Sequence, residues 1–161
     1  MRFSISPLVS EYNLNSEELA ALLRVVIEEG YIASLNAPGS SMIPFIRSED
    51  KIFVSPVEDK TIRTGDILAF IHASDGRVIA HRVVRIAGDR FLCKGDNVTN
   101  LFDGWISIED VLGRVIQVQR DGKPVRFGLG IERKLIAFLS LKTWLVPLID
   151  LLRRVKGGIA R

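Results

Sequence analysis

The chain of 161 residues is predicted to form a mainly β domain, a small folded sheet or barrel, with a helix before it and an apolar helix after it. Three observations predict this. Short apolar runs alternate with turn residues from Tyr31 to about Arg126, which is typical of closely connected strands. A helix start precedes them, and a long apolar stretch follows them. Because 47% of the residues are hydrophobic, a chain of this length can bury one real core.

A helix is predicted to begin after Asn15. Asn15 can cap the first turn, and Glu18, three residues on, completes a capping box. Five apolar residues then recur at helical spacing, namely Leu19, Leu22, Leu23, Val26 and Ile27. Gly30 is expected to end the helix. This helix either packs on the core or docks a partner.

The strands of the domain are predicted from short runs of apolar and β-branched residues. These runs cover residues 51–54, 66–71, 77–86, 90–93, 111–119 and 124–127. Asp75-Gly76 predicts a hairpin between the second and third runs. Gly88-Asp89 and Asp121-Gly122 mark two further turns.

The C-terminal stretch from Leu135 to Leu152 is mostly apolar, and basic residues flank it on both sides. It is about as long as a bilayer span, but Lys142 in its middle would be costly there. Pro147 is expected to kink the helix. Residues 131–155 are therefore expected to lie on a membrane surface, to pack on the core or another copy of the chain, or to span the bilayer.

Composition excludes several classes of function. The net charge of +3 is mild and the two signs are interspersed, so no nucleic-acid partner is expected. Cys93 is the single cysteine, which excludes an internal disulfide. No residues show metal-ligand spacing or a phosphate-binding loop, so no cofactor and no metal are expected. Residues 1–14 lack the long apolar run of a signal peptide, which leaves a cytoplasmic or membrane-associated location open.

Three short stretches carry the chemistry. They are Gly39-Ser40-Ser41-Met42-Ile43-Pro44, His81-Arg82-Val83-Val84 and Lys94-Gly95-Asp96-Asn97. They supply a serine, a histidine and an acid, which is the inventory of a serine hydrolase. Of the two histidines, His72 lies just before the Asp75-Gly76 turn, so His81 is the preferred base. Lys94 is the rival base, because a lysine can also activate a serine.

The three stretches, together with the step Gly65-Asp66 between them, resemble the type I signal peptidase family. The resemblance is greatest to the branch of the endoplasmic reticulum and archaea, which uses histidine as its base; related self-cleaving repressors use lysine. It covers residues 37 to 120, and the interval of 40 residues from Ser41 to His81 suits the family. We expect an N-terminal segment over 1–36, a catalytic β domain over 37–128 and the apolar helix over 129–161.

The resemblance implies a role for each site residue. Ser41 is the nucleophile in preference to Ser40, and Met42 and Pro44 shape the turn at the substrate site. Asp103 orients His81, while Asp96 shapes the site or shares that role. The Ser41 backbone N–H is the expected oxyanion donor, since Gly39 stands where many signal peptidases have a hydroxyl.

Two departures accompany the resemblance. A Gly-Asp turn of the family is replaced by Ser48-Glu49-Asp50, and residues 1–14 are not expected to form the membrane anchor that typical signal peptidases carry ahead of the serine. The expected function is a serine endopeptidase that cleaves a leader or precursor peptide after small side chains. The alternatives are an inactive peptide-binding module and a self-cleaving regulator. The expected partners are a peptide or protein substrate, with a membrane surface or a second copy of the chain left open.

Overall fold

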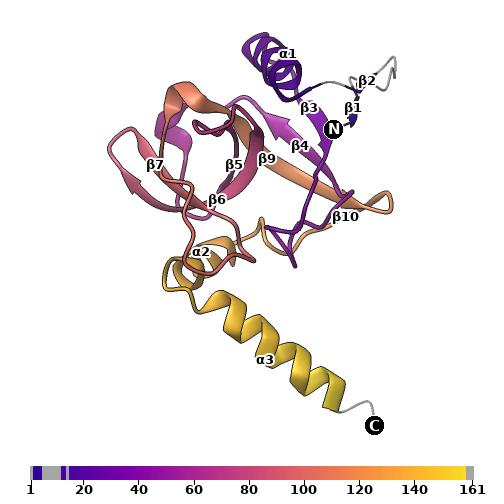
Figure 1. Cartoon of the computed structure of the whole chain (residues 1–161), viewed down its shortest axis with the longest axis vertical. Helices are drawn as coiled ribbons and strands as arrows, with labels where there is room; N and C mark the ends of the chain where they lie inside the picture. The colour runs from indigo at the N-terminus through magenta and orange to yellow at the C-terminus, as the bar shows by residue number, and fades with distance from the viewer. Residues whose placement is uncertain (1, 5–11, 14, 159–161) are drawn as a thin grey trace.

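The computed structural model describes residues 2–4, 12–13 and 15–158, with side chains from Asn15 onward except those of 152, 153 and 155–158. Within these residues, ten strands form one curled antiparallel sheet in the order β2-β1-β3-β4-β9-β5-β6-β7-β8, with β10 paired to β9 (Figure 1). The mainly β fold predicted from the sequence is therefore confirmed. The first fourteen residues, on which the absence of a signal peptide was predicted, lie mostly outside the described residues.

Six of the ten described strands lie on the predicted runs, and the other four, β1, β2, β3 and β8, were not predicted. The ten strands are β1 (Arg2–Ser4), β2 (Tyr12–Asn13), β3 (Ala33–Asn36), β4 (Lys51–Ser55), β5 (Ile67–Ile71), β6 (Val78–Ala87), β7 (Arg90–Lys94), β8 (Trp105–Ser107), β9 (Val111–Arg120) and β10 (Lys123–Pro124). Two single 3₁₀ turns, η1 (Asp59–Thr61) and η2 (Ile108–Asp110), precede β5 and β9. The Asp75-Gly76 turn joins β5 to β6 as predicted. The run 124–127 is a strand only at its first residue.

Helix α1 (Ser16–Glu28) begins and ends as its sequence predicts. The Asn15 side chain accepts from the Glu18 N–H, and the Glu18 carboxylate accepts from the Asn15 N–H, which closes the capping box. At the other end Gly30 adopts a φ of 85°, and the N–H groups of Gly30 and Tyr31 bond back to the last turn.

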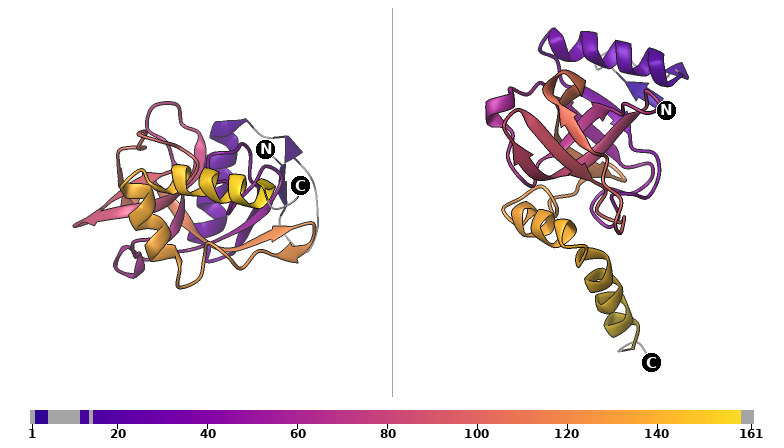
Figure 2. Two further views of the ribbon diagram at one scale, coloured as in Figure 1. Left: turned by 90° about the horizontal axis from the view of Figure 1, so that it is seen from below. Right: turned by 60° about the vertical axis from the view of Figure 1, so that its left-hand side comes forward.

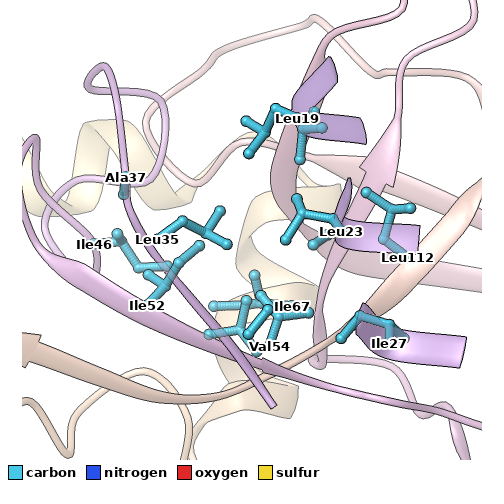
Figure 3. Packing of buried hydrophobic residues seen from close by; sticks show 14 of the residues in the cluster. Leu19, Leu23, Ile27, Leu35, Ala37, Ile46, Ile52, Val54, Ile67 and Leu112 are labelled. Carbon is cyan, nitrogen blue, oxygen red and sulfur yellow. The ribbon is translucent and has the colours of Figure 1, made fainter. Parts of the chain in front are cut away.

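The main core lies between α1 and the sheet. Leu19, Leu23 and Ile27 of α1 are buried, and Figure 3 shows them gathered with residues of β3, β4, β5 and β9. The strand residues labelled there are Leu35, Ile52, Val54, Ile67 and Leu112, and Ala37 and Ile46 of the β3–β4 connection lie with them. This face of α1 therefore closes one side of the curled sheet, which is the core-packing alternative for the helix.

The C-terminal stretch forms two helices, α2 (Arg133–Leu141) and α3 (Leu145–Gly158), where one kinked helix was predicted. The break comes at Thr143, whose φ is 59°, and not at Pro147. The N–H groups of Thr143 and Trp144 bond to the carbonyls of Ser140 and Leu139, which ends α2. Pro147 lies in the first turn of α3, where its missing N–H costs no hydrogen bond.

Candidate functional site

Ser41 lies in a tight turn between β3 and β4. The N–H groups of Ile43, Phe45 and Ile46 bond back to carbonyls within this turn, so the backbone around Ser41 is fixed. The Met42 side chain is buried in the main core, which anchors the turn from below. The Ile43-Pro44 peptide bond is cis.

His81 reaches the serine from strand β6. Its Nε2 lies 2.8 Å from Ser41 Oγ. The His81 ring meets the edge of the Phe70 ring on the neighbouring strand β5, with the ring centroids 6.5 Å apart. His81 is only 8% exposed, so the surrounding strands fix the orientation of the ring.

Asp103 completes a line of three side chains. It lies in the loop between β7 and β8, and its Oδ2 is 2.7 Å from His81 Nδ1. The Asp103 N–H donates to the Cys93 carbonyl at the end of β7, which holds this part of the loop against the sheet. An ionised carboxylate only accepts, so Nδ1 carries the proton and Nε2 is free to accept from Ser41 Oγ.

Asp96 contacts a different partner. Its carboxylate accepts from Nε and Nη2 of Arg82 at 2.9 and 2.7 Å, and both side chains are fully buried. Burial raises the pKa of Asp96, and the Arg82 guanidinium opposes that rise. Arg82 Nη1 also donates to the carbonyls of Gly65 and Gly128. The structure therefore places Asp103, and not Asp96, against His81.

The two rival bases lie away from Ser41. Lys94 is 1% exposed, donates from Nζ to the Ser140 carbonyl at 2.6 Å and lies over the Phe102 ring. Burial lowers the pKa of Lys94. His72 lies in the β5–β6 hairpin, where its Nδ1 contacts Ser74 and Asp75. Neither side chain is hydrogen-bonded to Ser41.

An open cleft of about 510 Å³ adjoins Ser41 and His81. One wall is the segment 37–42 with the Ser41 turn, and the other is Arg77 with the first half of β6, residues 78–81. Its floor is aliphatic and is formed by Leu35, Ile46, Ile52 and Ala69. Met42 is among the lining residues, whereas Pro44 is not. A mostly apolar cleft beside a serine suits an extended peptide better than a charged small molecule.

The first half of β6 offers a free strand edge to this cleft. Strand β5 pairs with residues 78–82 of β6, but β7 pairs with β6 only from Arg82 onward. Within the described strands, residues 78–81 therefore have no partner on the side away from β5. Such an edge presents backbone N–H and C=O groups to an added strand.

Three residues of the quoted stretches support the site, although none of them was assigned a role of its own from the sequence. Arg82 follows His81, and the alternation of a strand points it to the opposite face, where it meets Asp96. Asn97 donates its N–H to the Ser41 carbonyl at 2.6 Å and its side-chain amide to the Ser40 carbonyl at 3.2 Å. Gly95 packs against Ser41. An arginine within an apolar strand was the one available signal, since such a charge needs a buried partner.

The Ser41 backbone N–H is the candidate oxyanion donor. It makes no hydrogen bond within residues 15–158, so it is available to a bound group. Gly39, two residues earlier, has a φ of 80° and no side chain that could add a second donor. Among the described residues, no group of three or more His, Cys, Asp or Glu could hold a metal ion.

Comparison with protein families agrees with this geometry. The family model described as peptidase S24-like matches residues 6–101, which is more than half of the 161 residues. The matched region includes Ser41, His81 and Asp96, and it ends two residues before Asp103. No curated protein matches the chain. Such a match indicates a serine-type peptidase or a self-cleaving protein, and the chain belongs to the peptidase S24-like family.

Proposed function

We propose that this protein is a serine endopeptidase of the signal peptidase-like kind, which cleaves a leader or precursor peptide. One observation carries the proposal, namely the line of hydrogen bonds from Ser41 Oγ through His81 to Asp103, at 2.8 and 2.7 Å. A nucleophile, a base and a group that orients the base within hydrogen-bond reach form the working unit of this chemistry.

In the proposed reaction, Ser41 Oγ attacks the scissile carbonyl carbon while His81 Nε2 takes its proton. The Ser41 backbone N–H donates to the oxyanion that forms. His81 then gives the proton to the leaving amine, and an acyl group remains on Ser41. Water deprotonated by His81 hydrolyses this ester. Asp103 holds the Nδ1 proton throughout and stabilises the imidazolium at each transfer.

The proposed substrate binds extended along the free edge of residues 78–81, with Ser41 on its other side. The aliphatic floor of the cleft supports this, because it would take the side chains on one face of the added strand. The preference for small side chains before the cut rests on the resemblance to signal peptidases. The same site suits cleavage of a segment of this chain itself, an alternative that the family match favours.

Acylation with a serine-reactive fluorophosphonate, read by intact mass, tests the nucleophile. Wild type and Ser40→Ala are expected to gain one adduct, whereas Ser41→Ala gains none. His81→Ala is expected to label more slowly by a factor on the order of 10³, while His72→Ala labels like wild type. Asp103→Asn is expected to slow labelling comparably while the fold is kept, because the amide would favour the wrong tautomer of His81.

If neither wild type nor Ser41→Ala gains an adduct, while both are folded and a control enzyme reacts, the result would instead support an inactive peptide-binding module. If Ser41 is labelled, unlabelled wild type is next incubated at several protein concentrations. This separates self-cleavage from cleavage of a separate peptide substrate. Shortening of the chain at a rate independent of concentration would indicate self-cleavage. An intact chain that cuts members of a peptide library would support the endopeptidase.

A further inference from the structure

Helix α3 is the least supported element of the fold. It extends from α2 away from the sheet, at the end of the molecule opposite α1 (Figure 1, Figure 2). Leu145 and Ile149 of α3 pack in a small cluster with Phe45 and Ile136 of the body. A helix of 14 residues has marginal stability in water without a partner, so most of its length needs a further contact.

Trp144, immediately before α3, and one face of α3 present large apolar side chains to the outside. Trp144, Leu148 and Leu151 are 60%, 39% and 57% exposed, respectively. They are spaced by four and three residues, so they form one stripe along the helix. We call these three residues the α3 stripe. An exposed stripe of this size marks a surface that another phase or molecule covers.

The excess positive charge of the chain lies in the C-terminal segment that contains this stripe. Residues 131–161 hold seven of the 22 Lys and Arg but only two of the 19 Asp and Glu. This segment therefore carries a net charge of +5, while residues 1–130 carry −2. Lys142 and Arg154 are exposed, and each is close in sequence to one end of the α3 stripe. A partner of the stripe is therefore expected to be anionic.

The lengths of α2 and α3 decide whether this segment could cross a bilayer or lie on its surface. The break at Thr143 divides the apolar stretch into helices of 9 and 14 residues, and a span needs about 20. None of the helices in the described part of the chain is long and apolar enough to cross a bilayer. A short helix with Trp and Leu on one face and basic residues beside it lies in the plane of the interface.

We propose that α3 binds the surface of an anionic lipid bilayer. Trp144, Leu148 and Leu151 enter the boundary between headgroups and acyl chains, and Lys142 and Arg154 meet the lipid phosphates. A second copy of the chain suits this face less well, because two segments of charge +5 would repel each other across a symmetric contact. This inference goes beyond the proposed peptidase, and its test needs no activity.

Flotation of the full chain with lipid vesicles tests the proposal. Vesicles of phosphatidylcholine and phosphatidylglycerol in equal amounts are compared with vesicles of phosphatidylcholine alone. We expect the protein to float with the anionic vesicles only and to be released by salt. In the background Trp105→Phe, where Trp144 is the remaining tryptophan, its emission is expected to shift to shorter wavelength on binding.

Two sets of variants locate the contact. Leu151→Ser is expected to weaken vesicle binding by about tenfold or more, since it removes one leucine side chain that the bilayer would bury. Val25→Ser is the matched control, because Val25 is 59% exposed on α1 at the opposite end of the molecule. Lys142→Gln and Arg154→Gln are each expected to weaken binding about fivefold. These exposed charge variants keep the test decisive if Leu151→Ser does not fold.

Three results would overturn the proposal. The first is folded wild type that stays with the soluble fraction when anionic vesicles float. The second is equal weakening by Val25→Ser and Leu151→Ser. The third is a lipid-free dimer, or a complex with nucleic acid, that forms through the α3 stripe and excludes vesicles; sedimentation velocity with and without an RNA oligonucleotide detects both.

Discussion

Gly95 packs directly against Ser41. A Cβ at position 95 would lie 2.9 Å from the Ser41 carbonyl oxygen and 3.0 Å from Ser41 Cβ. The next loop residues continue this contact, because the Asn97 N–H donates to the same carbonyl at 2.6 Å. The Lys94–Asn97 stretch thus supports the serine turn from behind, and only glycine leaves enough space at its second position.

Gly95→Ala is expected to slow acylation of Ser41 by about 10²-fold, because a displacement near 1 Å can misalign a nucleophile by that much. The rate of fluorophosphonate labelling at matched protein concentration measures this. Gly88→Ala is the control, since Gly88 has a φ of 61° but no atom within 4 Å of its added Cβ. It should lower stability and leave labelling unchanged. If Gly95→Ala labels as fast as wild type, the serine turn adapts to the added methyl group without any loss of reactivity.

Asp96→Asn is expected to destabilise the fold by about 3–5 kcal/mol, because it leaves the buried Arg82 guanidinium without its anionic partner. Urea unfolding followed by circular dichroism gives this change. The remaining folded fraction should still label at Ser41, since Asp96 does not contact His81. Asp103→Asn is the matched comparison. It is expected to keep the stability of wild type and to label slowly, which is the opposite result. Slow labelling by a fully stable Asp96→Asn would assign Asp96 a part in orienting the base.

Asp50 is expected to stabilise the fold at neutral pH and to lose this effect in acid. Its carboxylate accepts from Arg120 Nη2 at 2.6 Å and from the Arg47 N–H at 2.8 Å. Burial alone would raise the pKa of Asp50, but these bonds outweigh it and hold the pKa below its ordinary value of 3.8. Because the folded-state pKa is the lower one, the stabilisation is present above pH 3.8 and disappears as the pH falls through the folded-state pKa.

Asp50→Asn should therefore lower the free energy of unfolding by about 2 kcal/mol at neutral pH, with the gap to wild type closing in acid. Urea unfolding of both proteins at a series of pH values measures the gap. Asp75→Asn, which breaks an exposed pair with Arg77, is the control and should change little. A gap for Asp50→Asn that stays constant from neutral to acid pH would mean that charge pairing with Arg120 contributes nothing.

Glu49 stands where the resembled family has a turn glycine, and it adopts a backbone conformation that favours glycine. Its φ of 69° lies in the left-handed region, where a side chain is strained. Its N–H still donates to the Ala37 carbonyl at 2.9 Å, which ties this turn to the segment that leads to Ser41. Glu49→Gly is expected to raise the free energy of unfolding by about 0.5–1 kcal/mol, after the greater entropy of glycine in the unfolded chain is deducted. Glu49→Ala, which keeps the Cβ, should be close to neutral in the same urea titration.

Local signals made much of the fold predictable. The capping box of Asn15 and Glu18, the stop at Gly30 and the Asp75-Gly76 hairpin depend on neighbours in sequence, so the sequence alone was enough. Strands β3 and β8 were not separated from the surrounding loops. They have only four and three residues, so the segments themselves give little signal, and pairing with the neighbouring strands β4 and β7 holds them in place. The break at Thr143 was missed because a threonine in the left-handed region leaves no mark in the sequence.

The sequence indicated the residues of the site and, by resemblance, the order Ser41, His81, Asp103, but it did not indicate the pairing of Asp96 with Arg82. Asp96 and Asp103 lie in one loop, seven residues apart, and turn chemistry fits both. What separates them is the alternation of β6, which sends His81 to one face and Arg82 to the other, so each aspartate meets a different partner. Pairing of Asp96 with Arg82 needed the path of the loop, which no spacing rule supplies.

The contacts of α2 bear on the predicted division of the chain at residue 128. Helix α2 covers the far side of the site: Ser140 accepts from the buried Lys94 at 2.6 Å, and Ile136 packs against Phe45 of the serine turn. At the start of α2, the Arg133 backbone lies 2.8 Å from where a Cβ on Gly65 would be, so these two segments are in close contact. We therefore propose that the catalytic domain includes α2 and the start of α3, as far as Ile149.

A chain ended after Gly128 is expected to unfold or to lose labelling at Ser41, whereas one ended after Asp150 should keep both. The shorter chain exposes Phe45 and leaves the Lys94 ammonium without its carbonyl acceptor; the lost core contacts alone are worth about 3–5 kcal/mol, a large part of the stability of a domain. The longer chain keeps Ile136, Leu145 and Ile149, so the cluster around Phe45 stays closed. Thermal unfolding by circular dichroism and labelling at Ser41 are measured on both. If the chain ended after Gly128 melts at the same temperature as wild type and labels at the same rate, strands β3 to β9 hold the serine turn without α2.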